Sequence, residues 1–144
     1  MRNTGNVDNG LLEVGEMQNG ALAFTQLGGI GSEWKIVGTG DYLGAGHPGF
    51  LMENTGNVAN GLLEVGEVTN GTLNFTQIGG VGPEWQFVGS GNYIDPNKAD
   101  FLMRNTANGV LDVGSVSNGT ASFTQVGGVG SEWNFHTSNV AVMP

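Results

Sequence analysis

The sequence contains no cysteine, and its permanent positive charges are only four: Arg2, Lys35, Lys98 and Arg104. Without cysteine the chain can form neither a disulfide nor a thiolate metal site, which suits the cytosol and equally suits the many cysteine-free proteins that bacteria export. The formal net charge is -9. We therefore expect neither nucleic acid nor an anionic membrane surface among its partners, because both would repel the chain.

Long apolar runs and catalytic groupings are scarce as well. No stretch is long enough to span a bilayer, the start does not read as a signal peptide, and no window has helical periodicity. The two histidines, His47 and His136, lie at non-equivalent places and have no repeated serine or carboxylate companion of the kind a catalytic triad needs. We expect a chain that is not an enzyme, needs no cofactor and does not insert into a membrane.

Glycine and repetition are what the sequence has in abundance, with 27 glycines in 144 residues. The stretch NGLLEVGEVTNGTLNFTQIGGVGPEW, residues 60–85, recurs without insertion or deletion at residues 9–34 and 108–133. The tryptophans that end the three copies are 51 and 48 residues apart. A period near 50 is typical of propeller blades and related arrays, in which one unit cannot bury its own face and packs on its neighbours.

Each unit is expected to consist of β-strands. Asn-Gly pairs at residues 19–20, 70–71 and 118–119 separate segments of alternating polarity. Such pairs favour the tight turn of a hairpin, because both residues tolerate a positive φ. Four strands then make a unit: a tryptophan strand, a Phe-Leu-Met strand, a strand such as LLEV and a strand that contains Phe-Thr-Gln.

The alternation also makes a prediction about glutamine. In residues 72–78 it places Phe75 and Gln77 on one face of the strand and Ile78 on the other. We expect Gln77, with Gln26 and Gln125 of the other units, to be buried beside a core phenylalanine and bonded to backbone groups.

The first residues of the chain match the interior of the later units, since MRNTGN resembles MENTGN and MRNTAN further on. We expect a single repeat domain over residues 1–144, with units at 1–33, 34–84 and 85–132. A spare tryptophan strand at 133–144 would complete the first unit. Either the chain is cut from a longer protein, or it closes on itself out of phase, which would leave no long sheet edge open.

The segments EWKIVGTGDYLGAGHPGFLMENT and EWQFVGSGNYIDPNKADFLMRNT resemble the FG-GAP/VCBS-type β-propeller repeats of bacterial secreted proteins. The resemblance covers nearly the whole chain, and related blades build the head of integrin α subunits. It implies an all-β fold, a β-propeller of four-stranded antiparallel blades with three blade equivalents per chain. It also implies a secreted or cell-surface bacterial protein that binds rather than catalyses. The alternative is a threefold β-trefoil or β-prism, since three four-stranded units in a chain of this length also suit those folds.

The resemblance further implies a calcium-binding loop between the first two strands of a blade. In the second unit Asp41 keeps the first position of that loop, but apolar residues and glycine replace the later oxygen ligands. In the third unit the remaining candidates are Asn92, Asp95, Asn97 and Asp100. Calcium takes about six to eight oxygen ligands, so we expect solvated turns and no bound calcium.

A Glu-Trp pair in every unit is the other candidate site. The pairs are Glu33 with Trp34, Glu84 with Trp85, and Glu132 with Trp133. Tryptophan is a favoured platform for sugars, but an indole at the start of an inner strand can equally pack between neighbouring blades. We favour packing and keep a carbohydrate-binding, lectin-like module with one weak site per blade as the alternative.

These features predict a non-catalytic structural or protein-interaction β-propeller with a protein or glycan ligand. Propellers close with about four to eight blades, so two chains of three blades related by a twofold axis would give a six-bladed ring. We expect a homodimer in which residues 133–144 of one chain complete the sheet begun by residues 2–10 of the other. An engineered or excised propeller fragment is a further alternative.

Overall fold

The computed structural model describes residues 1–136, and in that part of the chain every regular element is a β-strand. No described element is a helix long and apolar enough to cross a membrane. The strands are β1 (Leu11–Gln18), β2 (Ala21–Gly29), β3 (Trp34–Thr39), β4 (Gly49–Asn54), β5 (Leu62–Thr69), β6 (Thr72–Gly80), β7 (Trp85–Gly91), β8 (Asp100–Asn105), β9 (Val110–Ser117) and β10 (Thr120–Gly128).

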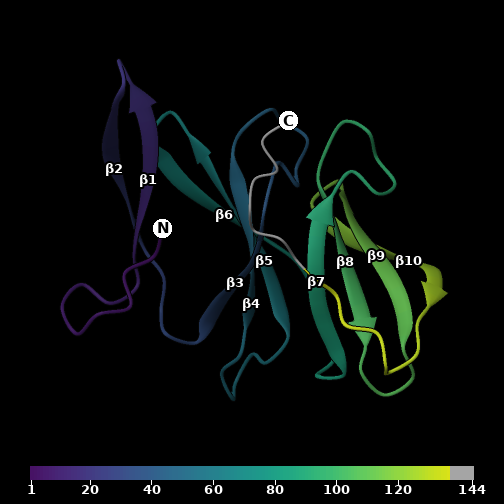
Figure 1. Cartoon of the computed structure of the whole chain (residues 1–144). Coiled ribbons are helices and arrows are strands. Elements are labelled where there is room, and N and C mark those ends of the chain that lie inside the picture. The colour runs from purple at the N-terminus through teal and green to yellow at the C-terminus, as the bar shows by residue number, and fades with distance from the viewer. Residues whose placement is uncertain (137–144) are drawn as a thin grey trace.

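The strands form three antiparallel sheets, in which each strand pairs with the next along the chain. The first sheet contains β1 and β2, the second contains β3 to β6, and the third contains β7 to β10. Figure 1 shows the three sheets one after another, with the first at one end of the row and the third at the other. The expectation of an all-β fold is confirmed, and the second and third units are four-stranded antiparallel sheets, whereas the first sheet has two strands among the described residues. A closed propeller and its number of blades stay predictions.

The three Asn-Gly pairs form the turns that join the last two strands of each unit. Asn19, Asn70 and Asn118 have φ of 51, 51 and 52°, and the glycines that follow them have φ of 78, 73 and 73°. Two successive positive φ angles are those of a type I′ turn, whose twist matches that of the flanking strands. The hairpins predicted from these pairs are confirmed.

The first sheet contains the end of a third strand. Asn3 donates its backbone N–H to the carbonyl of Leu11 at 2.8 Å, and Arg2 forms a bridge with Leu12. In the second sheet the equivalent residue Glu53 pairs with Leu63. Residues 1–3 therefore occupy the place of the last residues of β4. Residues 133–136 form no strand, and residues 137–144, the rest of the expected completing strand, lie outside the described residues.

A β-bulge lies near the end of each hairpin, directly after the glutamine. Glu64 pairs with Gln77 and Leu63 with Gly79, so Ile78 is the extra residue between them. Ile78 is buried in the cluster with Leu63, on the opposite face from Phe75 as alternation predicts, but Gln77 is exposed. The prediction of buried glutamines was wrong in all three units, because Gln26 and Gln125 lie in the same bulge and are also exposed.

Two apolar joints hold the three sheets together, and equivalent residues of the repeat build both. In the first joint Leu12, Leu27 and Ile30 of the first unit pack on the second sheet; in the second joint Leu63, Ile78 and Val81 do the same on the third. The opposing sides are also equivalent: Trp34, Ile36, Phe50, Met52 and Leu73 in the first joint, and Trp85, Phe87, Phe101, Met103 and Ala121 in the second.

A phenylalanine that lies over a glycine is at the centre of each joint. Phe50 pairs with Gly66, which in turn pairs with Phe75, and a Cβ on Gly66 would lie 2.3 Å from Cζ of Phe50. Phe101 covers Gly114 in the same way. Glycine is needed at these positions because the aromatic ring occupies the volume of the missing side chain.

Candidate functional site

The Glu-Trp pairs lie in tight turns that lead into the tryptophan strands. In each unit the backbone N–H of the tryptophan donates to the backbone carbonyl of the glycine three residues earlier, at 3.2 Å. The carbonyl of Glu33 accepts two hydrogen bonds from Thr55, one from its N–H at 2.7 Å and one from Oγ1 at 3.0 Å. Thr106 bonds the carbonyl of Glu84 in the same way. The backbone of each of these two pairs thus links the turn before its tryptophan strand to the loop that begins at Thr55 or Thr106.

The side chains of each pair point to different surroundings. The indoles of Trp34 and Trp85 are partly buried against the first and second joint, respectively. The carboxylates of Glu33 and Glu84 are on exposed residues and fold back over the glycines two residues earlier. Trp133 and Glu132 repeat the turn, but Trp133 is largely exposed. Packing between sheets therefore accounts for two of the three indoles.

Arginines fasten the same turns in two of the three units. Arg2 donates through its guanidinium to the carbonyls of Trp34 and Gly31, and Arg104 donates to those of Trp133 and Gly130 at 2.9 and 2.8 Å. The second unit has Glu53 at the equivalent position, which cannot donate. Burial raises the pKa of Glu53, and the charge of Lys35 on the neighbouring strand partly offsets that effect.

Three of the four calcium candidates lie in the loop between β7 and β8, the fourth, Asp100, is the first residue of β8, and all four bond mainly to the backbone of the loop. Asp100 is fully buried, and its Oδ2 accepts the N–H groups of Ile94 at 2.7 Å and Asp95 at 3.0 Å. Burial opposes the charge of Asp100, but these N–H groups, together with the Ser115 side chain and the charge of Lys98, keep the pKa of Asp100 below its ordinary value. Asp95 Oδ1 accepts the N–H of Asn97.

Asn92 is the first residue of that loop. Its Nδ2 donates to the carbonyls of Asp95, Pro96 and Lys98 at 3.3, 3.4 and 2.8 Å. The loop therefore holds itself closed with an amide group at the point where its carbonyls converge. In the second unit the carboxylate of Asp41 accepts three backbone N–H groups of the loop that follows it. Among the described residues no three His, Cys, Asp or Glu side chains gather closely enough to hold a metal.

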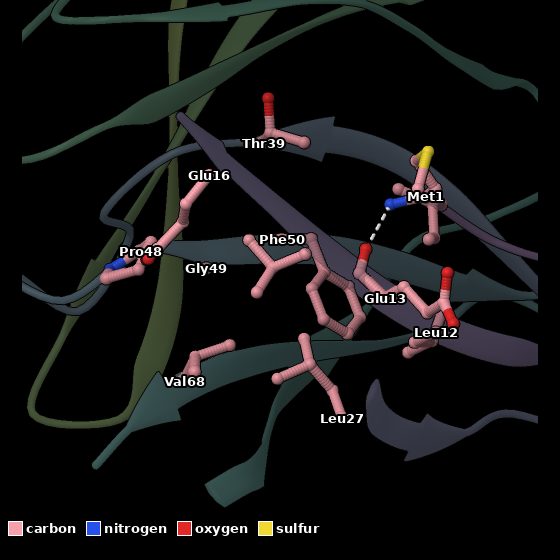
Figure 2. A pocket seen from close by; sticks show the side chains of 12 residues that line it. Met1, Leu12, Glu13, Glu16, Leu27, Thr39, Pro48, Gly49, Phe50 and Val68 are labelled. Carbon is pink, nitrogen blue, oxygen red and sulfur yellow. Dashed lines mark hydrogen bonds between the residues drawn. The ribbon is translucent and has the colours of Figure 1, made fainter. Parts of the chain in front are cut away.

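A cavity that the sequence does not predict lies at the first joint, beside β1. Its volume is about 220 Å³, and its lining includes Leu12, Val14, Leu27, Ile36, Phe50 and Val68. Figure 2 shows Phe50 between Leu12, Leu27 and Val68, and the hydrogen bond of 2.6 Å from the N-terminal amino group of Met1 to the carbonyl of Glu13 at the rim.

The cavity corresponds to a place that is filled in the second joint. There Leu51 of β4 and Val37 of β3 lie in the apolar cluster around Phe101. The first sheet has neither strand among the described residues, so the equivalent space beside Val14 is open. The sequence does contain one indication of this difference. Each of the three LLEV-type strands has a glycine at the same position, but a Phe-Leu-Met segment precedes only two of these strands.

No family model matches the chain, and no curated protein or solved structure is significantly similar to it.

Proposed function

We propose that the chain is a non-catalytic structural or protein-interaction module of the β-propeller type, and that two copies join end to end into a closed ring of six sheets. One observation carries the proposal: the two ends of the row expose the two halves of the joint that is formed twice inside the chain. The FG-GAP/VCBS-type resemblance, with its secreted or cell-surface bacterial location, belongs to the same proposal.

The first sheet exposes the half of the joint that contains the glycine. Gly15 is exposed, whereas the equivalent Gly66 and Gly114 are buried. Met17 is 70% exposed, whereas the equivalent Val116 is 2% exposed. Apolar faces of this kind are rarely left in water, and they mark sites of association.

The third sheet exposes the other half. Tyr93 is 47% exposed, whereas the equivalent Tyr42 is 1% exposed and bonds to Ser90 of the next sheet. Val126 is 51% exposed, whereas the equivalent Ile78 is 2% exposed. The sheet that follows theirs covers Tyr42 and Ile78. No sheet follows the third in the described part of the chain, so Tyr93 and Val126 stay exposed.

The total number of sheets in the ring favours two copies of the chain. The two ends of the row are unlike, so contact between copies is head to tail, and such contacts produce a ring when the rotation closes. Two copies supply six sheets, within the range of about four to eight blades in known propellers, whereas three copies supply nine. The face-to-face packing of successive antiparallel sheets also supports the propeller over the threefold alternatives.

The packing of the repeated side chains supports a non-catalytic role. Trp34 and Trp85 are used in the joints, and Glu33 and Glu84 accept hydrogen bonds through backbone carbonyls in the turns. The lectin-like alternative has a well-exposed indole at Trp133 alone among the three pairs. A glycan array separates the two roles, because weak multivalent sugar binding would favour the lectin.

Light scattering on the purified chain tests the ring. A mass near twice 14.9 kDa supports it, and a stable, folded monomer contradicts it. Leu22→Asp places a charge on the exposed face of the first sheet and should give a folded monomer. Val58→Asp, in a fully exposed loop away from the joints, is the matched control and should leave the mass unchanged. Circular dichroism should show both variants folded.

A further inference from the structure

The sequence contains the dipeptide Asn-Gly six times, and the structure places the six copies in two different settings. Three copies form the hairpin turns, at residues 19–20, 70–71 and 118–119, and are called the turn pairs. The other three begin the repeated stretch, at residues 9–10, 60–61 and 108–109, and are called the opening pairs. In this dipeptide the glycine nitrogen can attack the asparagine side chain, because glycine has no side chain to hinder the close approach. The same reactive group therefore occurs in two environments.

The glycines of the opening pairs are anchored in the fold. The N–H of Gly61 donates to the carbonyl of Asn54 at 2.7 Å, and the carbonyl of Gly61 accepts the N–H of Val81 at 2.9 Å. Gly10 and Gly109 form the equivalent two bonds in their own units, and all three glycines are buried. A Cβ on Gly61 would lie 2.0 Å from the carbonyl oxygen of Val81. The backbone of the opening pairs is therefore tightly packed as well as bonded.

The glycines of the turn pairs have no such anchor. Within residues 1–136, no backbone hydrogen bond involves the N–H of Gly20, Gly71 or Gly119. Gly20 and Gly71 are exposed, and Gly119 is half-buried. Nothing lies within 4 Å of a Cβ built on Gly20 or Gly71. The described part of the chain therefore leaves the peptide bond between the two turn residues free to rotate.

A rotation of that peptide bond gives the geometry that the attack needs. The first central residue has ψ of about 30° in a type I′ turn and about −120° in a type II′ turn, with the same positive φ in both. Both turns join antiparallel strands through two residues, so the flanking strands stay paired. The second central residue changes the sign of its φ, which glycine tolerates. With ψ at the type II′ value, the glycine nitrogen lies beside Cβ of the asparagine and can reach Cγ.

We propose that the three turn pairs are sites of spontaneous deamidation, at Asn19, Asn70 and Asn118, and that the opening pairs are protected. A base removes the proton of the glycine N–H, and the nitrogen then attacks Cγ of the asparagine. The new N–Cγ bond forms as the amide C–N bond breaks, and the amide nitrogen leaves as ammonia after it takes a proton from water. The resulting succinimide ring adds one molecule of water. Opening at one carbonyl gives aspartate, and opening at the other gives isoaspartate.

The two products should affect the fold differently. Aspartate followed by glycine also favours a type I′ turn, so the aspartate form keeps the hairpin and adds only a negative charge. Isoaspartate adds one carbon atom to the main chain of a two-residue loop, and the length of the loop fixes the register of the hairpin. In the second unit that register begins with Thr69 opposite Thr72. The isoaspartate form should therefore be the less stable of the two.

The experiment uses the purified whole chain, incubated in mildly alkaline buffer. Samples taken over time are digested with a protease that is active in acid, which stops further reaction, and the peptides are analysed by mass spectrometry. Conversion of amide to acid should appear first at Asn19, Asn70 and Asn118. The three asparagines of the opening pairs should react at least about fivefold more slowly, since rotation there must break a hydrogen bond of the glycine N–H. The reaction should accelerate as the pH rises.

Unfolding the chain in urea provides the matched control, because all six copies then have the same open surroundings. In urea the opening pairs should react as fast as the turn pairs. Asn70→Gly leaves a Gly-Gly turn, which also suits type I′, and should remove the signal at residue 70 alone while circular dichroism shows a folded chain. Asn70→Asp supplies the aspartate form, and its thermal midpoint should exceed that of the isoaspartate form separated by chromatography.

Two results would overturn the inference. Equal rates at all six pairs in the folded chain would show that only unfolded molecules react. Reaction of all six in urea, but of none in the folded chain over the same period, would show that the turns hold their peptide bonds as firmly as the buried glycines do. The inference does not depend on the ring, because all six pairs lie within one chain. A monomer in light scattering leaves it standing, and protected turns leave the ring standing.

Discussion

The phenol oxygen of Tyr42 lies 2.6 Å from the hydroxyl oxygen of Ser90, and the two residues belong to different sheets. Tyr42 comes from the loop between β3 and β4 and is buried, while Ser90 is on β7. The hydrogen bond is a polar contact within an otherwise apolar joint. Because a buried hydroxyl without a partner costs free energy, the bond favours one relative placement of the two sheets.

Tyr42→Phe should lower the free energy of unfolding by about 1 kcal/mol, the usual net value of one hydrogen bond together with the group it leaves unpaired. Urea unfolding measures the change. Tyr93→Phe is the matched control, since Tyr93 is the equivalent residue at the exposed end of the row and its change should stay within about 0.5 kcal/mol. Equal losses in the two variants would contradict this account of the joint.

Alkaline unfolding should depend on Tyr42. Burial raises the pKa of Tyr42 to about 12, and the bond to Ser90 only partly offsets that rise. The folded state therefore holds the proton more tightly than the unfolded state. This contribution to stability is complete below about pH 10, the ordinary tyrosine value, and is lost as the pH rises toward 12.

The loss between these pH values should be roughly 2–3 kcal/mol. It should be smaller in Tyr42→Phe than in the wild type, as measured by urea unfolding at a series of pH values. Parallel pH dependence in the two proteins would show that other groups control alkaline unfolding.

Alanine substitutions should separate the covered glycines from the uncovered one. Gly66→Ala and Gly114→Ala place a Cβ 2.3 and 2.2 Å from a phenylalanine ring atom, and overpacking of this kind costs about 1–3 kcal/mol. Gly15→Ala should change the free energy of unfolding by less than about 0.5 kcal/mol. Thermal or urea unfolding ranks the three variants, and a loss at Gly15 as large as at Gly66 would show that Gly15 is already covered.

Calcium should not stabilise the chain. The loop that begins at Asn92 is closed by hydrogen bonds to its own backbone, and three of its carbonyls already accept hydrogen bonds from the Asn92 amide. Thermal unfolding with calcium and with a chelator should give the same midpoint. A site in the folded state occupied at a hundred times its dissociation constant would add about 2.7 kcal/mol, so an upward shift in calcium would reveal a site.

The strand order and the hairpins could be predicted from the sequence because they depend on neighbouring residues. Asn70 and Gly71 determine their turn through backbone angles that few other residues adopt. The exposure of Gln77 could not be predicted, because alternation assigns a side chain to a face but does not show what covers that face. Phe75, on the same face, is itself 44% exposed.

The candidate site was predictable only in part, for a similar reason. The missing tryptophan strand of the first unit is visible in the sequence. The cavity beside Val14 and the bond between Tyr42 and Ser90 are not, because both arise where one sheet packs on another. Such contacts join residues that are distant along the chain, and no local pattern encodes them. The alignment of the units shows that Glu53 stands where the first unit has Arg2. It does not show how this difference affects the turn.

The two joints inside the chain are built from equivalent residues, and this makes the units interchangeable. A chain shortened or lengthened by one whole unit would still begin and end with the same two surfaces. In the proposed ring, chains of unequal length would be able to mix, provided that their units add up to a number that closes. If the ring forms, growth or loss of a single repeat in the gene would change its size without requiring a new interface.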